Sequence, residues 1–243
     1  MPDGIDPALS QESVEGLRRA DLASGELEAS LRAVADATSR TFEADGGGIM
    51  LLDDQQTLHY VGATNGRSAA LEAAQEETGE GPCVDSLVHD TVTSTNDLVT
   101  DERWPVLQSQ VAELGVHGLI GVPLHLGLSA VGSLNVYRAA PHEWTERDVA
   151  AIRAHAEVIE ELLVVAMRAQ RDHTIVQQLR TALENRVTIE RAVGFVIAAR
   201  GLDAVKAFNE LRLLARSRRV RVAALAEEII TTKTFPPGEG GAS

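Results

Sequence analysis

Residues 118–137, GLIGVPLHLGLSAVGSLNVY, decide the fold of the first part of this chain. Two apolar runs, 118–126 and 130–137, are separated by the short turn Gly127-Leu128-Ser129. This spacing predicts two antiparallel strands joined by a tight connection. We therefore expect an antiparallel sheet at the centre of the domain.

The sequence before this hairpin adds further strands and helices. A second hairpin is predicted from strands at 49–52 and 57–63, and a short strand is predicted at 91–95. Asp45 and the three glycines after it should end the preceding helix. Consecutive hairpins among helices predict an α+β domain over residues 25–165. Its helices are expected at 27–42, 67–77, 83–89 and 104–114.

From Thr145 the pattern becomes that of one long helix. Thr145 is a suitable N-cap residue. From Thr145 to Arg200 the sequence has no proline and a single glycine, Gly194. We expect a helix over 148–200 whose apolar stripe lacks an intrachain partner and forms a coiled coil with a second copy. The alternative is two helices with a break near 172–174. The expected homodimer interface consists of Ile159, Val176, Leu179, Leu183, Val193 and Ile197.

The C-terminal part predicts a small helical module. Two shorter helices are expected at 203–217 and 222–230, and with the end of the long helix they form a three-helix module over 166–232. Such a module is too small to be stable without a dimer partner. Proline and glycine residues predict a disordered tail at 233–243.

Charge divides the chain into two parts. The formal net charge is −14, yet residues 165–235 hold 13 Lys+Arg against 7 Asp+Glu, a net charge of +6, which leaves −20 for the rest. No acidic residue lies between Glu210 and Glu227, so nothing nearby in sequence neutralises the arginines there. A basic module on an acidic body predicts a polyanionic partner. Five arginines fall within ten residues: Arg212, Arg216, Arg218, Arg219 and Arg221.

Residues 185–194, NRVTIERAVG, resemble the core of the first helix of ANTAR domains from bacterial antitermination regulators. The resemblance continues through AFxxLR at 207–212 and VxxLA at 222–226. It implies binding to hairpin loops of mRNA, in transcription antitermination or translation control. Phe208 fits a core position, but an exposed aromatic ring there could also stack on an unpaired base. Arg212 should project from the edge of the same apolar stripe, beside Phe208. The expected RNA-binding residues are Arg186, Arg191, Arg200, Lys206, Phe208, Arg212, Arg216, Arg218, Arg219 and Arg221.

The first part of the chain, from about residue 27 to 166, resembles a GAF sensor domain. The resemblance implies a regulator tuned by its sensor, and a possible small-molecule pocket lined by residues 48–52 and 84–98. The motifs that carry it are GPC at 81–83, DL at 97–98, DxRWP at 101–105, GV at 115–116, VPL at 122–124 and GxLN at 132–135.

The residue types that most often carry catalysis form no catalytic pattern in this sequence. The single cysteine, Cys83, fits a buried structural position better than a redox site. The seven histidines lack the spacing of metal ligands, and the glycines at 46–48 precede a strand rather than a helix. We therefore expect no enzyme activity, no cofactor and no metal. Four residues are expected to shape a loop and a helix start: Asp97, Asp101, Arg103 and Trp104.

The apolar segments are too short to span a membrane, and the N-terminus lacks the features of a secretion signal, which favours a cytoplasmic protein. The polar segment 1–24 is expected to be a lead-in, either loose or with a short helix. Two other functions remain open. Three short basic helices can also form a helix-turn-helix-like DNA-binding transcription factor, or the chain could be a ligand sensor that acts through a protein partner.

Overall fold

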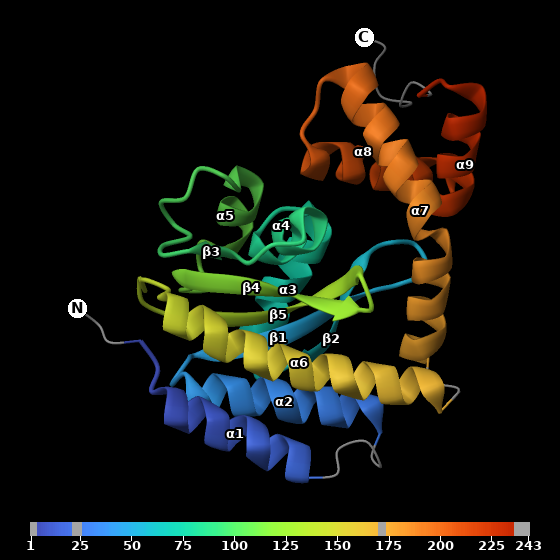
Figure 1. Ribbon diagram of the computed structural model, residues 1–243. Coiled ribbons are helices and arrows are strands. Elements are labelled where there is room, and N and C mark those ends of the chain that lie inside the picture. The colour runs from blue at the N-terminus through green and yellow to red at the C-terminus, as the bar shows by residue number, and fades with distance from the viewer. Residues whose placement is uncertain (1–3, 21–25, 170–173, 236–243) are drawn as a thin grey trace.

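The computed structural model describes residues 4–20, 26–169 and 174–235 (Figure 1). Its centre is a five-stranded antiparallel sheet with the strand order β2-β1-β5-β4-β3. The hairpin predicted at 118–137 is confirmed as its β4–β5 pair. The strands are β1 Gly46–Leu52, β2 Leu58–Ala63, β3 Thr93–Thr95, β4 Gly118–Leu126 and β5 Ser129–Arg138.

The glycines at 46–48 belong to β1, so the strand begins three residues earlier than expected. A side chain would not fit there: a Cβ on Gly48 would lie 2.5 Å from a carboxylate oxygen of Glu72. The glycines therefore let a helix approach the strand closely, and they do not merely end the preceding helix.

Helices cover both faces of the sheet (Figure 1). Leu31, Ile152 and Leu134 are fully buried in the core between one helical layer and the sheet. The N-terminal segment contributes a helix to that layer, which is one of the two forms expected of it. That layer consists of α1 Pro7–Arg19, α2 Leu27–Thr41 and α6 Glu146–Arg168, and the opposite layer of α3 Gly66–Thr78, α4 Pro82–His89 and α5 Pro105–Val111.

The start of α6 is fixed by a reciprocal cap. The Thr145 hydroxyl accepts a hydrogen bond from the backbone N–H of Asp148, and the Asp148 carboxylate accepts one from the backbone N–H of Thr145. The same carboxylate accepts a hydrogen bond from the backbone N–H of Ile5 at 2.9 Å. The cap therefore also ties the N-terminal segment to the sheet domain.

The expected continuous helix over 148–200 is wrong, and the alternative of two helices is confirmed. Helix α6 ends at Arg168 and α7 Thr174–Arg200 follows; the expected break at 172–174 lies partly outside the described residues. In Figure 1, α7 runs steeply away from the direction of α6. Val176 and Leu179 are fully buried in the core of the sheet domain, so the chain itself covers this part of the stripe.

The last helices form the expected three-helix module. The end of α7 packs with α8 Ala204–Arg218 and α9 Val222–Thr232 around Leu211 and Leu225, both fully buried. Gly201, with φ of +67°, ends α7 in the left-handed conformation that glycine favours. Asp203 then caps α8 by accepting a hydrogen bond from the backbone N–H of Lys206. Of the tail expected at 233–243, residues 236–243 lie outside the described residues.

Candidate nucleic-acid interface

An exposed cationic surface lies where α8 passes into α9. Arg216 is exposed near the end of α8, Arg219 occupies the C-cap of that helix, and Arg221 the N-cap of α9. Arg191 is exposed on α7. Within the described residues, none of these four guanidinium groups forms an ion pair. We call them the outer arginines.

Four other predicted RNA contacts form ion pairs with neighbours, and one of them is Arg186, which pairs with Glu190 of the same helix at 2.6 Å. Arg218 pairs with Glu228 of α9 at 3.1 Å, and Arg200 pairs with Glu210 of α8 at 2.7 Å. Lys206 pairs with its helix cap, Asp203, at 3.0 Å. No carboxylate nearby in sequence neutralises the arginine run, as expected, but folding brings Glu228 from ten residues away to Arg218.

Three predicted RNA contacts, among them Arg186, lie against the sheet domain and are partly buried. Arg186 donates a hydrogen bond to the carbonyl of Ala130, the second residue of β5. Phe208 lines a small apolar pocket of about 210 Å³ together with Leu52 of β1 and Leu87 of α4. We call Arg186, Phe208 and Arg212 the inner face.

Arg212 is the most enclosed of these residues. Its guanidinium donates a hydrogen bond to Asn209 at 3.3 Å and lies 5.7 Å from the centre of the Phe208 ring. Its Nε has no partner, and burial lowers the pKa of the guanidinium below its ordinary value. The expectation that Arg212 lies beside Phe208 is thus confirmed, and both residues are partly buried against the sheet domain.

Besides the bond from Arg186 to Ala130, two hydrogen bonds join the module to the sheet domain. The Asn209 side-chain amide of α8 donates to the carbonyl of Gly79 at 2.7 Å, and the Gln56 amide donates to the carbonyl of Ala182 in α7 at 3.1 Å. Gly79 has φ of +66°, and a Cβ there would lie 2.7 Å from the Asn209 amide. Both polar contacts join backbone on one side to a side chain on the other, so they fix the relative position of the two parts.

The six residues expected at a dimer interface are accounted for within one chain. Ile159, Val176 and Leu179 are fully buried in the sheet-domain core, and Leu183 packs against it. Val193 packs in the three-helix core, and Ile197 lines the small apolar pocket. Four of the six residues thus pack within the sheet domain of their own chain, whereas Val193 and Ile197 are partly exposed, and the homodimer stays a prediction.

Comparison with known families agrees with this division of the chain. The model of the GAF domain matches residues 26–163, which is more than half of the chain, and the model of the ANTAR domain matches residues 177–230. The chain belongs to the GAF family. It is a fusion of a GAF domain with an ANTAR domain, as the sequence resemblance implied. A search of the curated proteins finds no match.

Solved structures of GAF domains share the fold of the sheet domain. A GAF domain from an Acinetobacter phosphoenolpyruvate-protein phosphotransferase is 15% identical, covers 66% of this chain and 96% of its own, and has a TM-score of 0.53. The corresponding domain from Coxiella burnetii is 18% identical, covers 67% and 94%, and has a TM-score of 0.52. A free methionine-R-sulfoxide reductase from Neisseria meningitidis is 16% identical, covers 67% and 92%, and has a TM-score of 0.53. At these identities the likeness shows the fold alone.

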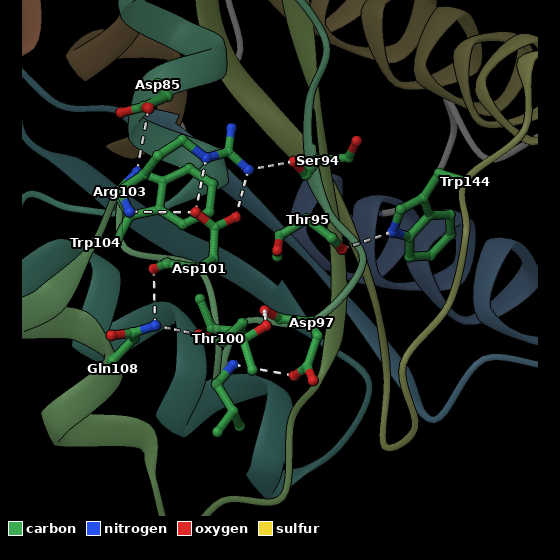
Figure 2. Close-up of polar contacts among 12 residues, drawn as sticks. Asp85, Ser94, Thr95, Asp97, Thr100, Asp101, Arg103, Trp104, Gln108 and Trp144 are labelled. Carbon is green, nitrogen blue, oxygen red and sulfur yellow. Dashed lines mark hydrogen bonds and ion pairs between the residues drawn. The ribbon is translucent and has the colours of Figure 1, made fainter.

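The loop before α5 of the GAF domain has the structural role expected of it (Figure 2). Arg103 binds the Asp101 carboxylate and donates a hydrogen bond to the carbonyl of Ser94 at 2.7 Å. The hydrogen bond from Arg103 holds the pKa of Asp101 at about 2. Trp104 donates from Nε1 to Asp85, and the carboxylate of Asp97 accepts a hydrogen bond from the backbone N–H of Val99. These bonds stay within the loop and its neighbours and fix its conformation.

Sequence reasoning missed a buried polar cluster between α3 and the sheet. The carboxyl group of Glu72 accepts hydrogen bonds from the Cys83 thiol at 3.2 Å, Asn135 at 2.9 Å and Gln75 at 3.1 Å. Cys83 is fully buried, as expected, and burial raises the pKa of its thiol, which keeps the group unreactive. No local pattern marks Glu72, because acidic residues are common on α3 and only one of them faces the sheet.

This cluster predicts a pH-dependent stability. Burial raises the pKa of Glu72 to about 7. Because the folded state favours the protonated carboxyl group, its contribution to the free energy of unfolding is fully present below the unfolded-state pKa of about 4.5. This contribution is lost as the pH rises through 7, and the loss amounts to about 3 kcal/mol. Glu72→Gln, which stays neutral, should remove this fall in urea unfolding measured from pH 5 to 8. The exposed Glu28→Gln serves as the control. Parallel pH profiles for wild type and Glu72→Gln would contradict the prediction.

Among the described residues, no group of three or more His, Cys, Asp or Glu side chains could hold a metal ion. No helix in the described part of the chain is both long and apolar enough to cross a membrane.

Proposed function

We propose that the chain regulates gene expression by binding hairpin loops of mRNA through its ANTAR domain, under control of its GAF domain. ANTAR domains bind RNA in antitermination, and GAF domains are sensor domains. The observation that carries the proposal is the outer arginine surface, which projects four guanidinium groups from an otherwise acidic protein. Arginine suits this role because its planar group binds phosphate with two hydrogen bonds.

The division between outer and inner residues suggests how the GAF domain acts. The outer arginines can meet phosphates in the present conformation, whereas Arg186, Phe208 and Arg212 are enclosed against the GAF domain. A loop base needs an aromatic or guanidinium surface on which to stack. We infer that the described conformation binds RNA weakly through charge, and that separation of the domains exposes the inner face for loop recognition.

The helix-turn-helix alternative has less support. Helix α9 would have to enter the major groove, yet it carries the exposed Glu227 and Glu228, which would approach DNA phosphates. Glu228 also pairs with Arg218, so one cation of the connector is already satisfied. Both features argue against α9 as a helix that enters the major groove of DNA.

A competition gel separates these functions. Labelled stem-loop RNA is bound by the full chain and challenged with unlabelled duplex DNA or with the same RNA. We expect the RNA to compete at least tenfold better than the DNA. Equal competition would support the DNA-binding alternative. Absence of any shift would favour a sensor that acts through a protein partner.

A further inference from the structure

A cleft of about 580 Å³ separates the GAF domain from α8 of the ANTAR domain, and its two walls carry opposite charges. The GAF wall presents Asp53, Glu76 and Glu77, and the ANTAR wall presents Arg212 and Arg216. The volume lies within the range of small-molecule sites, which are often found between domains. The opposed walls distinguish this cleft from the small apolar pocket beside Phe208.

Part of this charge is satisfied within the protein. The ring of His59 lies between two carboxylates of the GAF wall, with one nitrogen 2.8 Å from Asp53 and the other 2.8 Å from Glu76. Asp53 also accepts hydrogen bonds from the backbone N–H groups of Gln55 and Thr57. These two carboxylates therefore have partners.

The other charged groups of the cleft have no ion-pair partner among the described residues. Within the described residues, neither Arg212 nor Arg216 forms an ion pair, and Glu77 has none either. The Nε of Arg212 is buried without an acceptor, a condition that proteins avoid because an unpaired buried donor is costly. The two arginines and Glu77 thus line the same cleft without pairing to each other.

We propose that this cleft binds a small zwitterion of the amino-acid class. Its carboxylate is held by Arg212 and Arg216, and its ammonium group by Glu77. A simple anion would leave Glu77 facing negative charge, and a simple cation would face the two arginines. Only a molecule with both groups satisfies both walls.

Such a ligand contacts both domains, so it binds the closed arrangement and not the separated one. By linkage it stabilises the closed form and weakens RNA binding. This second step rests on the proposed function, whereas ligand binding itself does not. The experiment therefore measures the two steps separately.

The first measurement is calorimetric titration of the full chain with each of the twenty amino acids. Glutarate and cadaverine, which carry only carboxylates or only ammonium groups, are the controls for charge. We expect at least one amino acid to bind, and to bind at least tenfold more tightly than either control. Failure of all twenty, or equal binding of glutarate or cadaverine, would overturn the proposal.

Variants then locate the site. Arg212→Gln and Glu77→Gln should each weaken binding of that amino acid at least tenfold. Arg153→Gln, which removes the same charge as Arg212→Gln but on the exposed side of α6, should leave binding unchanged. Equal affinity of all four proteins would overturn the assignment to this cleft. Circular dichroism at the temperature of the titration confirms that each variant is folded.

The second measurement repeats stem-loop RNA binding with the cleft saturated by the amino acid. We expect RNA affinity to fall at least fivefold in wild type and not in Glu77→Gln. An unchanged RNA affinity in wild type would overturn the linkage and leave the binding site standing. Absence of RNA binding under all conditions would instead count against the proposed function.

Discussion

Replacing Arg216, Arg219 and Arg221 by glutamine should reduce affinity for a stem-loop RNA by about 100-fold or more at low salt. These three exposed guanidinium groups crowd the α8–α9 connector, and within the described residues they form no ion pair that already satisfies them. Each phosphate contact that is lost also lowers the number of counterions released on binding. The slope of log affinity against log salt should therefore become shallower by about 2.

The matched control changes three exposed arginines of the GAF domain, Arg32, Arg67 and Arg153, to glutamine. This control has the same net charge as the test variant but keeps the ANTAR surface. We expect it to retain wild-type affinity within about threefold. An equal loss in both variants would mean that RNA responds to total charge, and the assignment to the connector would fail.

The second large effect concerns release of the inner face. Gln56→Gly combined with Gly79→Ala should raise the affinity of the full chain for a stem-loop RNA by about 10- to 100-fold. The first change removes the hydrogen bond to Ala182, and glycine suits the φ of +58° at that position. The second places a Cβ 2.7 Å from the Asn209 amide and disturbs its bond to Gly79. Loss of two hydrogen bonds at about 1 kcal/mol each, together with the clash, lowers the stability of the closed form relative to the separated form. This destabilisation accounts for the expected gain in RNA affinity of about 10- to 100-fold.

Both changes lie in the GAF domain, so the RNA-binding residues stay intact. Thr145→Ala, which removes the cap of α6 far from the domain contact, controls for general loss of stability. We expect its RNA affinity to match wild type. If the double variant binds RNA no better than Thr145→Ala, the GAF domain does not mask the inner face.

Much of the fold was predictable from the sequence. Apolar runs bounded by turn residues located the strands, as at 118–137, and cap residues such as Asp203 located the starts of helices. The prediction of a single long helix was wrong for a physical reason. Residues between Arg168 and Thr174 include no Pro or Gly to mark an interruption, and a stripe containing Val176 and Leu179 fits a coiled coil as well as a domain core.

The candidate site was predictable only in part. Helical spacing correctly placed Arg212 beside Phe208, but it could not reveal that the GAF domain covers them, because that depends on residues such as Gly79 more than 100 positions away. The pairing of Arg218 with Glu228 depends in the same way on how α8 and α9 pack. Charge counts therefore identified the right domain, and only the fold separated outer from inner arginines.

The central claim is that the ANTAR domain recognises unpaired loop bases and does not merely attract phosphate. It is tested most directly by measuring the affinity of the full chain for one hairpin with an unpaired loop and for its fully paired duplex, across a salt series. The account predicts a steep fall with salt for both RNAs, with a slope of about −3 if four arginines touch phosphates, and a preference for the hairpin that persists at high salt. Equal affinity for the two RNAs at every salt concentration would contradict it.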